Sequence, residues 1–137
     1  MTQMGDALGL MGLALRAGKA ALGEKAVEDA VRSKKARLVC SAFDMSPAGM
    51  NRVTRLLLGA AIPHIILPYT KDTLGASFGR ETCAVVAVTD IGIAAGVARS
   101  LAEKQPDKYG EQAGLLEEKN QKIQSRKKIK PGKAGRG

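Results

Sequence analysis

Aromatic residues are almost absent from this chain. Two Phe, two Tyr and no Trp make up 3% of its 137 residues. Proteins that bind single-stranded nucleic acid usually stack its bases on exposed rings. We expect Phe43 and Phe78 to be packed in the core, which leaves only Tyr69 and Tyr109 for such a role. The composition therefore disfavours a single-strand binder, and the core must consist of Ala, Val, Leu, Ile and Met.

Residues that commonly carry catalysis or bind metals are equally scarce. The single histidine, His64, lies in an apolar run, where a packed or surface-facing strand residue is the simpler interpretation than a general base. Cys40 and Cys83 also lie in apolar runs and are expected to be buried, reduced thiols. No Cys or His spacing suits zinc, and no glycine motif suits a nucleotide. We predict a protein that is not an enzyme and uses no metal or cofactor.

Long apolar runs are missing as well. No run approaches the roughly 18 residues of a transmembrane helix. The apolar stretch near the N-terminus follows Asp6 and is interrupted by Arg16 and Lys19, unlike a signal peptide. We therefore predict a cytoplasmic protein.

Positive charge is abundant and unevenly distributed. The net charge is +9, of which residues 1–104 carry +4 and residues 105–137 carry +5. The last sixteen residues, 122–137, contain seven basic residues and no acidic one. A polyanionic partner suits this pattern, because each neutralised phosphate releases counterions. A solubilising tail is the alternative.

The spacing of apolar residues predicts helices over residues 4–17, from 23 to about 33, from 47 to about 60, from 70 to 79 and from 90 to about 101. Strands are expected over residues 37–43, 62–67 and 83–89, and a short strand is one interpretation of residues 19–22. Ser46, Thr70 and Asp90 are the expected N-caps, with Pro47 at the first position of its helix.

From residue 37 onward, strands and helices alternate, which favours an α/β fold with parallel strands and helices on both faces. After Lys104, Pro106 and Gly110 break the pattern, and the final residues are rich in Lys, Arg and Gly. We predict one domain over residues 1–104, followed by a basic, flexible tail over residues 105–137 that is disordered when unbound.

The start of the second helix is a candidate binding site. Free backbone N–H groups at Gly23-Glu24-Lys25 suit a phosphate or a turn of an RNA backbone. Further basic residues follow this helix, including Lys34 and Lys35. The alternative is a solvated face, on which Lys25 pairs with Asp29 and Glu28 pairs with Arg32.

The order of the sequence motifs resembles the L7Ae family of ribosomal proteins, which bind kink-turn RNA, and its bacterial, ribosome-associated YlxQ-type branch in particular. The matching segments are LALRAGKAALGEKAVEDAVRSKKARLV at 13–39, SAFDMSP at 41–47, IPHIILPYTKDTLGASFGRE at 62–81 and CAVVAVTD at 83–90. This resemblance implies a three-layer α/β/α sandwich around a small mixed sheet.

The resemblance also implies an RNA site. Gly23, Glu24 and Lys25 correspond to the helix start that enters the kink and meets its tandem G·A pairs. The loop that covers the unstacked bases corresponds to Arg80, Glu81, Thr82 and Cys83. Phosphate contacts correspond to basic residues on and after the second helix, which are Arg32, Lys34 and the adjacent Lys35 here. The chain departs from the family pattern at Ala26, Asp29 and Phe43, where Glu or Gln, Lys and Glu are common.

These observations predict a monomeric, non-catalytic protein that binds structured RNA, ribosomal RNA or the ribosome in particular, and neither a membrane nor a small-molecule substrate. A second hypothesis assigns most of the affinity to the basic residues of 119–137. The alternative function is a protein-interaction module of the same fold that has lost kink-turn specificity, which Ala26 and Asp29 suggest.

Overall fold

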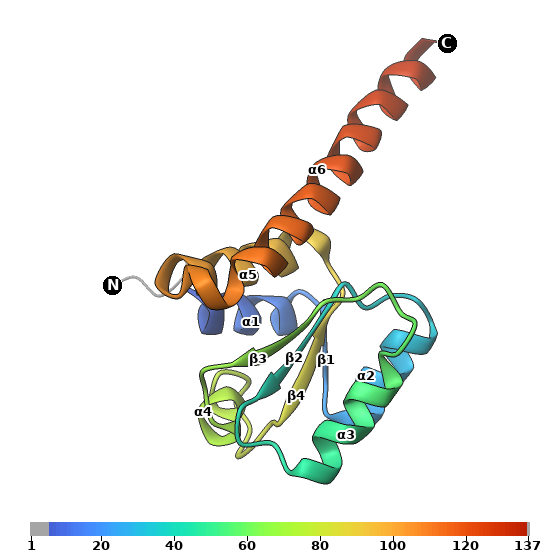
Figure 1. Ribbon diagram of the computed structural model, residues 1–137. Helices are drawn as coiled ribbons and strands as arrows, with labels where there is room; N and C mark the ends of the chain where they lie inside the picture. The colour runs from blue at the N-terminus through green and yellow to red at the C-terminus, as the bar shows by residue number, and fades with distance from the viewer. Residues whose placement is uncertain (1–5, 137) are drawn as a thin grey trace.

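A computed structural model describes the backbone of residues 6–136 and the side chains of residues 6–126. One sheet has the strand order β1-β4-β2-β3 and consists of β1 (Ala20–Leu22), β2 (Leu38–Ala42), β3 (His64–Leu67) and β4 (Val85–Val88) (Figure 1). The helices of the described residues are α1 (Ala7–Arg16), α2 (Glu24–Arg32), α3 (Pro47–Leu56), α4 (Lys71–Ala76), α5 (Ile91–Lys104) and α6 (Pro106–Arg136).

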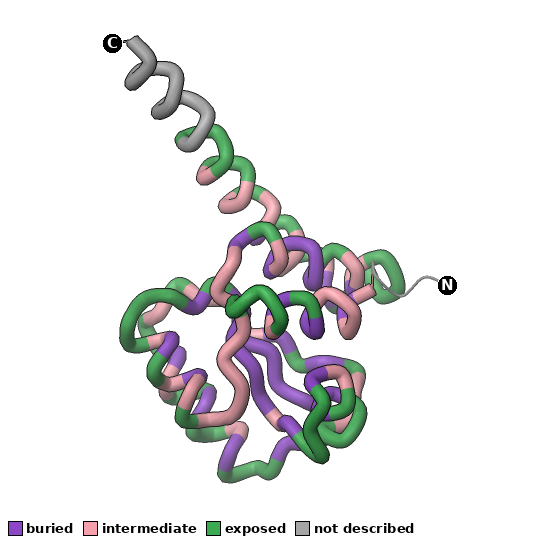
Figure 2. Tube along the Cα trace, turned by 180° about the vertical axis from the view of Figure 1, so that it is seen from behind, coloured by how far each residue is buried: buried purple, intermediate pink, exposed green. Residues whose placement is uncertain are grey.

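The helices cover both faces of the sheet. α2 and α3 lie on one face, and α1 and α5 lie on the other (Figure 1). Alternate residues of β4 serve the two layers: Val86 and Val88 pack with α1 and α5, whereas Val85 and Ala87 pack with α2 and α3. Figure 2 shows the buried residues gathered between the helices and the sheet. The predicted three-layer α/β/α sandwich is confirmed.

The sheet is mixed rather than parallel. β2 and β3 are parallel, but β4 pairs antiparallel with both β1 and β2. The parallel arrangement that the alternating pattern favoured is therefore wrong for β4, and the mixed sheet implied by the family resemblance is confirmed. The reason is the brevity of α4, whose six residues span only about 9 Å. A parallel connection must carry the chain back along the whole sheet. Instead, the Cys83 N–H donates to Lys71 O at 2.9 Å, so β4 starts at the end where β3 stops.

Side chains cap the helices where the sequence predicted caps. Ser46 accepts a hydrogen bond from Gly49 N, with Pro47 in the first turn of α3. Thr70 caps α4 and Asp90 caps α5 in the same way. Each cap satisfies a backbone N–H group that has no acceptor within its own helix.

The segment after α5 differs from the prediction of a flexible tail. α6 begins at Pro106, and its first half packs against the domain through Tyr109, which is 2% exposed, and the fully buried Leu116. The Tyr109 hydroxyl donates to Ile66 O at 2.9 Å, and Lys119 Nζ donates to Ala61 O at 3.0 Å. The side chains of the most basic stretch, residues 127–137, lie outside the described part of the chain. Within residues 6–136, no helix is long and apolar enough to cross a membrane.

Candidate functional site

Four connections meet at one end of the sheet, the lower end in Figure 1. They are the β1–α2 turn at Gly23, the β2–α3 loop from Phe43, the β3–α4 loop up to Lys71, and the α4–β4 loop with Arg80–Cys83. We call this end of the molecule the loop end. It collects these segments because β1, β2 and β3 finish there and the antiparallel β4 begins there.

Hydrogen bonds tie the four connections together. The Gly23 N–H donates to Val85 O at 2.9 Å, and the Ala42 N–H donates to Ala84 O at 2.8 Å. The Lys71 N–H donates to Asp44 Oδ1 at 2.7 Å, and Lys71 O accepts from the Cys83 N–H. The start of α2 and the 80–83 loop, which the sequence placed on one surface, therefore lie side by side.

Gly23 has a conformation that favours glycine, with φ +90° and ψ 163°. This turn directs the chain from β1 into α2 without a capping side chain. The first N–H groups of α2 have no acceptor within the helix, so their partial positive charge is concentrated at the loop end.

The α4–β4 loop is held at an unusually short distance from α4. A Cβ atom added to Gly75 would lie 2.6 Å from Thr82 Cα and 2.8 Å from Thr82 N, closer than real side chains approach. Only glycine at this position lets the loop pass so close to the helix. Three residues of this loop are exposed, namely Arg80, Glu81 and Thr82, whereas Cys83 is 6% exposed and packs in the core beneath the sheet's helix layer of α1 and α5. Burial raises the pKa of the Cys83 thiol. This effect outweighs the smaller lowering of the pKa by backbone groups of Val85 and Gly23.

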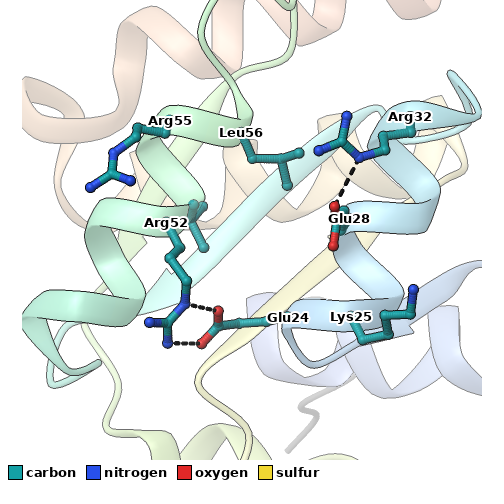
Figure 3. A pocket seen from close by; sticks show the side chains of 8 residues that line it. Glu24, Lys25, Glu28, Arg32, Arg52, Arg55 and Leu56 are labelled. Carbon is teal, nitrogen blue, oxygen red and sulfur yellow. Dashed lines mark hydrogen bonds and ion pairs between the residues drawn. The ribbon is translucent and has the colours of Figure 1, made fainter.

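Glu24 links α2 to α3. Its carboxylate accepts hydrogen bonds from Arg52 Nε at 2.6 Å and Arg52 Nη2 at 3.0 Å (Figure 3). These hydrogen bonds hold the pKa of Glu24 below its ordinary value. Lys25 pairs with Asp29 on the exposed surface of α2, at 3.5 Å, and Arg32 pairs with Glu28. The helical pairs expected for a solvated face are thus present.

A groove of about 510 Å³ lies between α2 and α3. Arg52 and Glu24 line it near the loop end, and Arg55, Leu56 and Arg32 line it farther along the two helices (Figure 3). Four cationic and two anionic side chains border the groove: Lys25, Arg32, Arg52, Arg55, Glu24 and Glu28. Each of the two carboxylates forms an ion pair with an arginine.

The structure separates some of the predicted site residues. Lys34 and Lys35 follow the C-terminus of α2, whereas Gly23 precedes its N-terminus. The nine residues of the helix span about 13 Å, so the two groups lie at opposite ends of the sheet. Gly23, Glu24 and Lys25 share the loop end with Arg80, Glu81, Thr82 and Cys83, but Arg32, Lys34 and Lys35 do not.

Sequence reasoning missed two residues near the loop end. Phe43 is 56% exposed, so the expectation that it is packed is wrong, whereas Phe78 is buried as expected. The exposure of Phe43 has no clear signal in the sequence, because all five residues of the preceding β2 are buried and alternation is lost. Arg52 had a weak signal, since it lies outside the apolar stripe of its helix formed by Met50, Val53 and Leu57. Within the described residues, no group of three His, Cys, Asp or Glu side chains is placed to hold a metal ion.

A small mixed sheet between helix layers, with four connections gathered at one end, defines a class of compact three-layer α/β domains. The model of the Ribosomal protein L7Ae/L30e/S12e/Gadd45 family matches residues 6–96, and the chain belongs to this family. The family resemblance recognised in the sequence is thereby confirmed. The matched segment ends within α5, so α6 lies beyond it.

Three known proteins are similar to this chain in sequence or in structure. The chain is 38% identical over 85 residues to the RNA-binding protein YlxQ of Bacillus subtilis, a match that covers 62% of this chain and 84% of that protein. A solved protein of unknown function from Bacillus halodurans is 28% identical with a TM-score of 0.59, and covers 64% of this chain and 87% of its own. The 15.5kD RNA binding protein of Giardia lamblia superimposes with the same TM-score at 18% identity, over 70% of this chain and 82% of its own, which shows a shared fold.

Proposed function

We propose that this chain binds structured RNA, ribosomal RNA with a kink-turn-like motif in particular, as a cytoplasmic, ribosome-associated monomer without catalytic activity. The observation that carries the proposal is the junction of the α2 N-terminus with the 80–83 loop, pinned by the hydrogen bond from Gly23 to Val85. Membership of the family and the likeness to an RNA-binding relative support it.

The loop end offers two kinds of contact to a kinked RNA. The free N–H groups at the start of α2, together with Lys25, suit polar base edges and a phosphate. The exposed residues Arg80, Glu81 and Thr82 form a rim beside them that suits bases lifted out of a stack. Shape and positioned backbone groups therefore supply recognition at this end.

A charge reversal at Lys25 tests the proposal. We expect Lys25→Glu to weaken binding of a kink-turn RNA in a titration, because the new carboxylate lies beside the α2 N-terminus and repels phosphate. Lys104→Glu, which makes the same charge change at the exposed end of α5, is the matched control. A second RNA with its tandem G·A pairs replaced by Watson–Crick pairs measures specificity. Equal affinity of the Lys25→Glu and control variants would remove the loop end from consideration.

One observation favours a second candidate, a protein-interaction module that has lost kink-turn specificity. The charged side chains at the loop end balance: four are basic and four acidic, namely Lys25, Arg52, Lys71, Arg80, Glu24, Asp44, Asp72 and Glu81. The exposed ring of Phe43 beside them also suits a protein partner. Sedimentation with ribosomes separates the candidates: association that survives nuclease treatment and requires Phe43 but not Lys25 supports the protein partner.

A further inference from the structure

The N-terminus of α2, which the proposed function assigns to RNA, begins without a capping side chain. In α1, α3, α4 and α5 the residue before the helix accepts a hydrogen bond from a backbone N–H of the first turn, whereas α2 follows Gly23. The acidic residue in the first turn of α2 is Glu24. A carboxylate at such a position is attracted to the free N–H groups of its own helix. Glu24 could therefore occupy the groups that an RNA would need.

The structure turns the Glu24 carboxylate toward α3 instead. Arg52 of α3 donates hydrogen bonds to Glu24 Oε1 at 2.6 Å and to Glu24 Oε2 at 3.0 Å, and within the described residues no other hydrogen bond reaches this carboxylate. Figure 3 shows Glu24 directed toward α3 and Lys25 directed to the other side of α2. A Cβ atom added to Gly49 would lie 3.1 Å from Glu24 Oε2, so the carboxylate lies against the first turn of α3.

The helix α2 itself offers Glu24 no cation. The residue one turn ahead on the same face is Glu28, and like charges at this spacing repel. The cations of α2 have other partners, since Arg32 pairs with Glu28 at 2.9 Å and Lys25 pairs with Asp29 at 3.5 Å. Without its partner on α3, the carboxylate would be driven away from Glu28 and toward the N-terminus of α2.

Stability gives little reason for this ion pair. The side chains of Arg52 and Glu24 are 58% and 39% exposed, and exposed ion pairs contribute little to the free energy of unfolding. The hydrogen bonds from Arg52 hold the pKa of Glu24 below its ordinary value, so this carboxylate is charged at neutral pH. The ion pair therefore determines where a full negative charge lies at the loop end.

We propose that Arg52 is a positioning residue for RNA binding: it holds the Glu24 carboxylate against α3 and so keeps the first N–H groups of α2 free for the RNA. This inference rests on the proposed function and extends it to a residue of α3. The guanidinium also compensates the carboxylate charge, which reduces the repulsion of an approaching phosphate. Loss of Arg52 should consequently weaken binding only while residue 24 carries a carboxylate.

A double-mutant cycle on the full chain tests the proposal. Arg52→Gln is made in the wild type and in a chain that carries Glu24→Gln, and each protein is titrated with a kink-turn RNA. We expect Arg52→Gln to weaken binding by about three- to tenfold in the wild type, the size of a charge effect at a helix terminus, and to have little effect after Glu24→Gln. An equal loss in both backgrounds would overturn the proposal, because Arg52 would then act through its own RNA contact or through the packing of α3. No loss in either background would overturn it as well.

The matched control is the ion pair between Arg99 and Glu117, which joins α5 to α6 at 3.4 Å. It also consists of an arginine and a glutamate on two different helices, and neither residue belongs to the loop end. The same cycle with Arg99→Gln and Glu117→Gln should show no coupling in RNA binding. Thermal melting followed by circular dichroism verifies that all variants fold.

Amide hydrogen exchange in the free protein, measured by NMR, provides a readout that needs no RNA. We expect exchange at Lys25 and Ala26 to slow in Arg52→Gln, because the released carboxylate accepts from the first N–H groups of α2, and Glu24→Gln should remove this protection. Unchanged exchange would overturn the proposal whether or not RNA binds. Failure of the proposed function has a different signature: exchange would respond to Arg52→Gln as expected, but the wild type would not distinguish the kink-turn from an RNA whose tandem G·A pairs are replaced by Watson–Crick pairs.

Discussion

Gly75 controls how closely the α4–β4 loop approaches α4, and its replacement by alanine is predicted to disturb that loop. The added Cβ atom would lie 2.6–2.8 Å from three backbone atoms of Thr82, whereas ordinary contacts begin at 3.4 Å. The loop or the helix must therefore move by about 0.8 Å. Neither can yield by a simple change of rotamer, because the contact is with backbone.

The expected cost follows from two opposing effects. Overpacking of this kind destabilises a fold by roughly 1–3 kcal/mol, whereas alanine gains about 0.5–1 kcal/mol over glycine within a helix. We expect Gly75→Ala to lower the free energy of unfolding by about 1–2 kcal/mol, measured by urea denaturation. Under the proposed function it should also weaken RNA binding by the folded protein, because Arg80, Glu81 and Thr82 shift with the loop.

Gly114→Ala provides the matched control. Gly114 is an exposed residue of α6, and a Cβ atom there would meet nothing within 4 Å. The same chemical change should raise stability by about 0.5–1 kcal/mol at this position. If Gly75→Ala were as stable as Gly114→Ala, the close approach of Thr82 would not constrain the loop.

Three further predictions concern α2, α6 and β3. Lys34→Gly should stabilise the fold by about 0.5–1 kcal/mol in urea denaturation, because glycine relieves the positive φ, and should weaken RNA binding; lower stability would contradict this account. Leu116→Ala should cost about 2–5 kcal/mol if α6 is packed as described, whereas Leu115→Ala, at a position 48% exposed, should change stability little; equally small effects would show that α6 does not contribute to the core. Burial lowers the pKa of His64 below its ordinary value of 6.5, so the unfolded chain binds this proton more readily; stability should fall as the pH drops below about 6.5, and His64→Gln should reduce that dependence between pH 7.5 and pH 5.

Much of the fold follows from local patterns in the sequence. The apolar runs at 37–43 and 83–89 and the caps at Ser46 and Asp90 fixed the main strands and helices, because each signal involves neighbouring residues. The direction of β4 did not follow, since it depends on how α4 packs after β3. The helix α6 was predicted as a flexible tail because Pro106 and Gly110 break the pattern after Lys104, but Pro106 is its first residue and packing against α5 offsets the low helix propensity of Gly110.

The candidate site was less accessible from the sequence. The proximity of Gly23 to the 80–83 loop followed only from the family resemblance, because about sixty residues separate them along the chain. Two aromatic side chains were predicted wrongly: Phe43 was expected in the core but is exposed, and Tyr109 was expected at the surface but is buried. Tyr109 lies in a segment that looks polar, so the sequence does not indicate that its hydroxyl is buried. Its hydrogen-bond acceptor is the carbonyl of Ile66, which belongs to the distant strand β3.

The hydrogen bond between Tyr109 and Ile66 also bears on how copies of this chain can associate. β3 is the outermost strand on its side of the sheet, and an open strand of this kind readily pairs with a strand from another molecule. The hydroxyl of Tyr109 occupies a carbonyl that such a neighbour would need. At the opposite margin, β1 offers only three residues for pairing. Growth of the sheet from one molecule into the next is therefore obstructed on both sides, which helps to keep this protein from aggregating while its charged surfaces remain free.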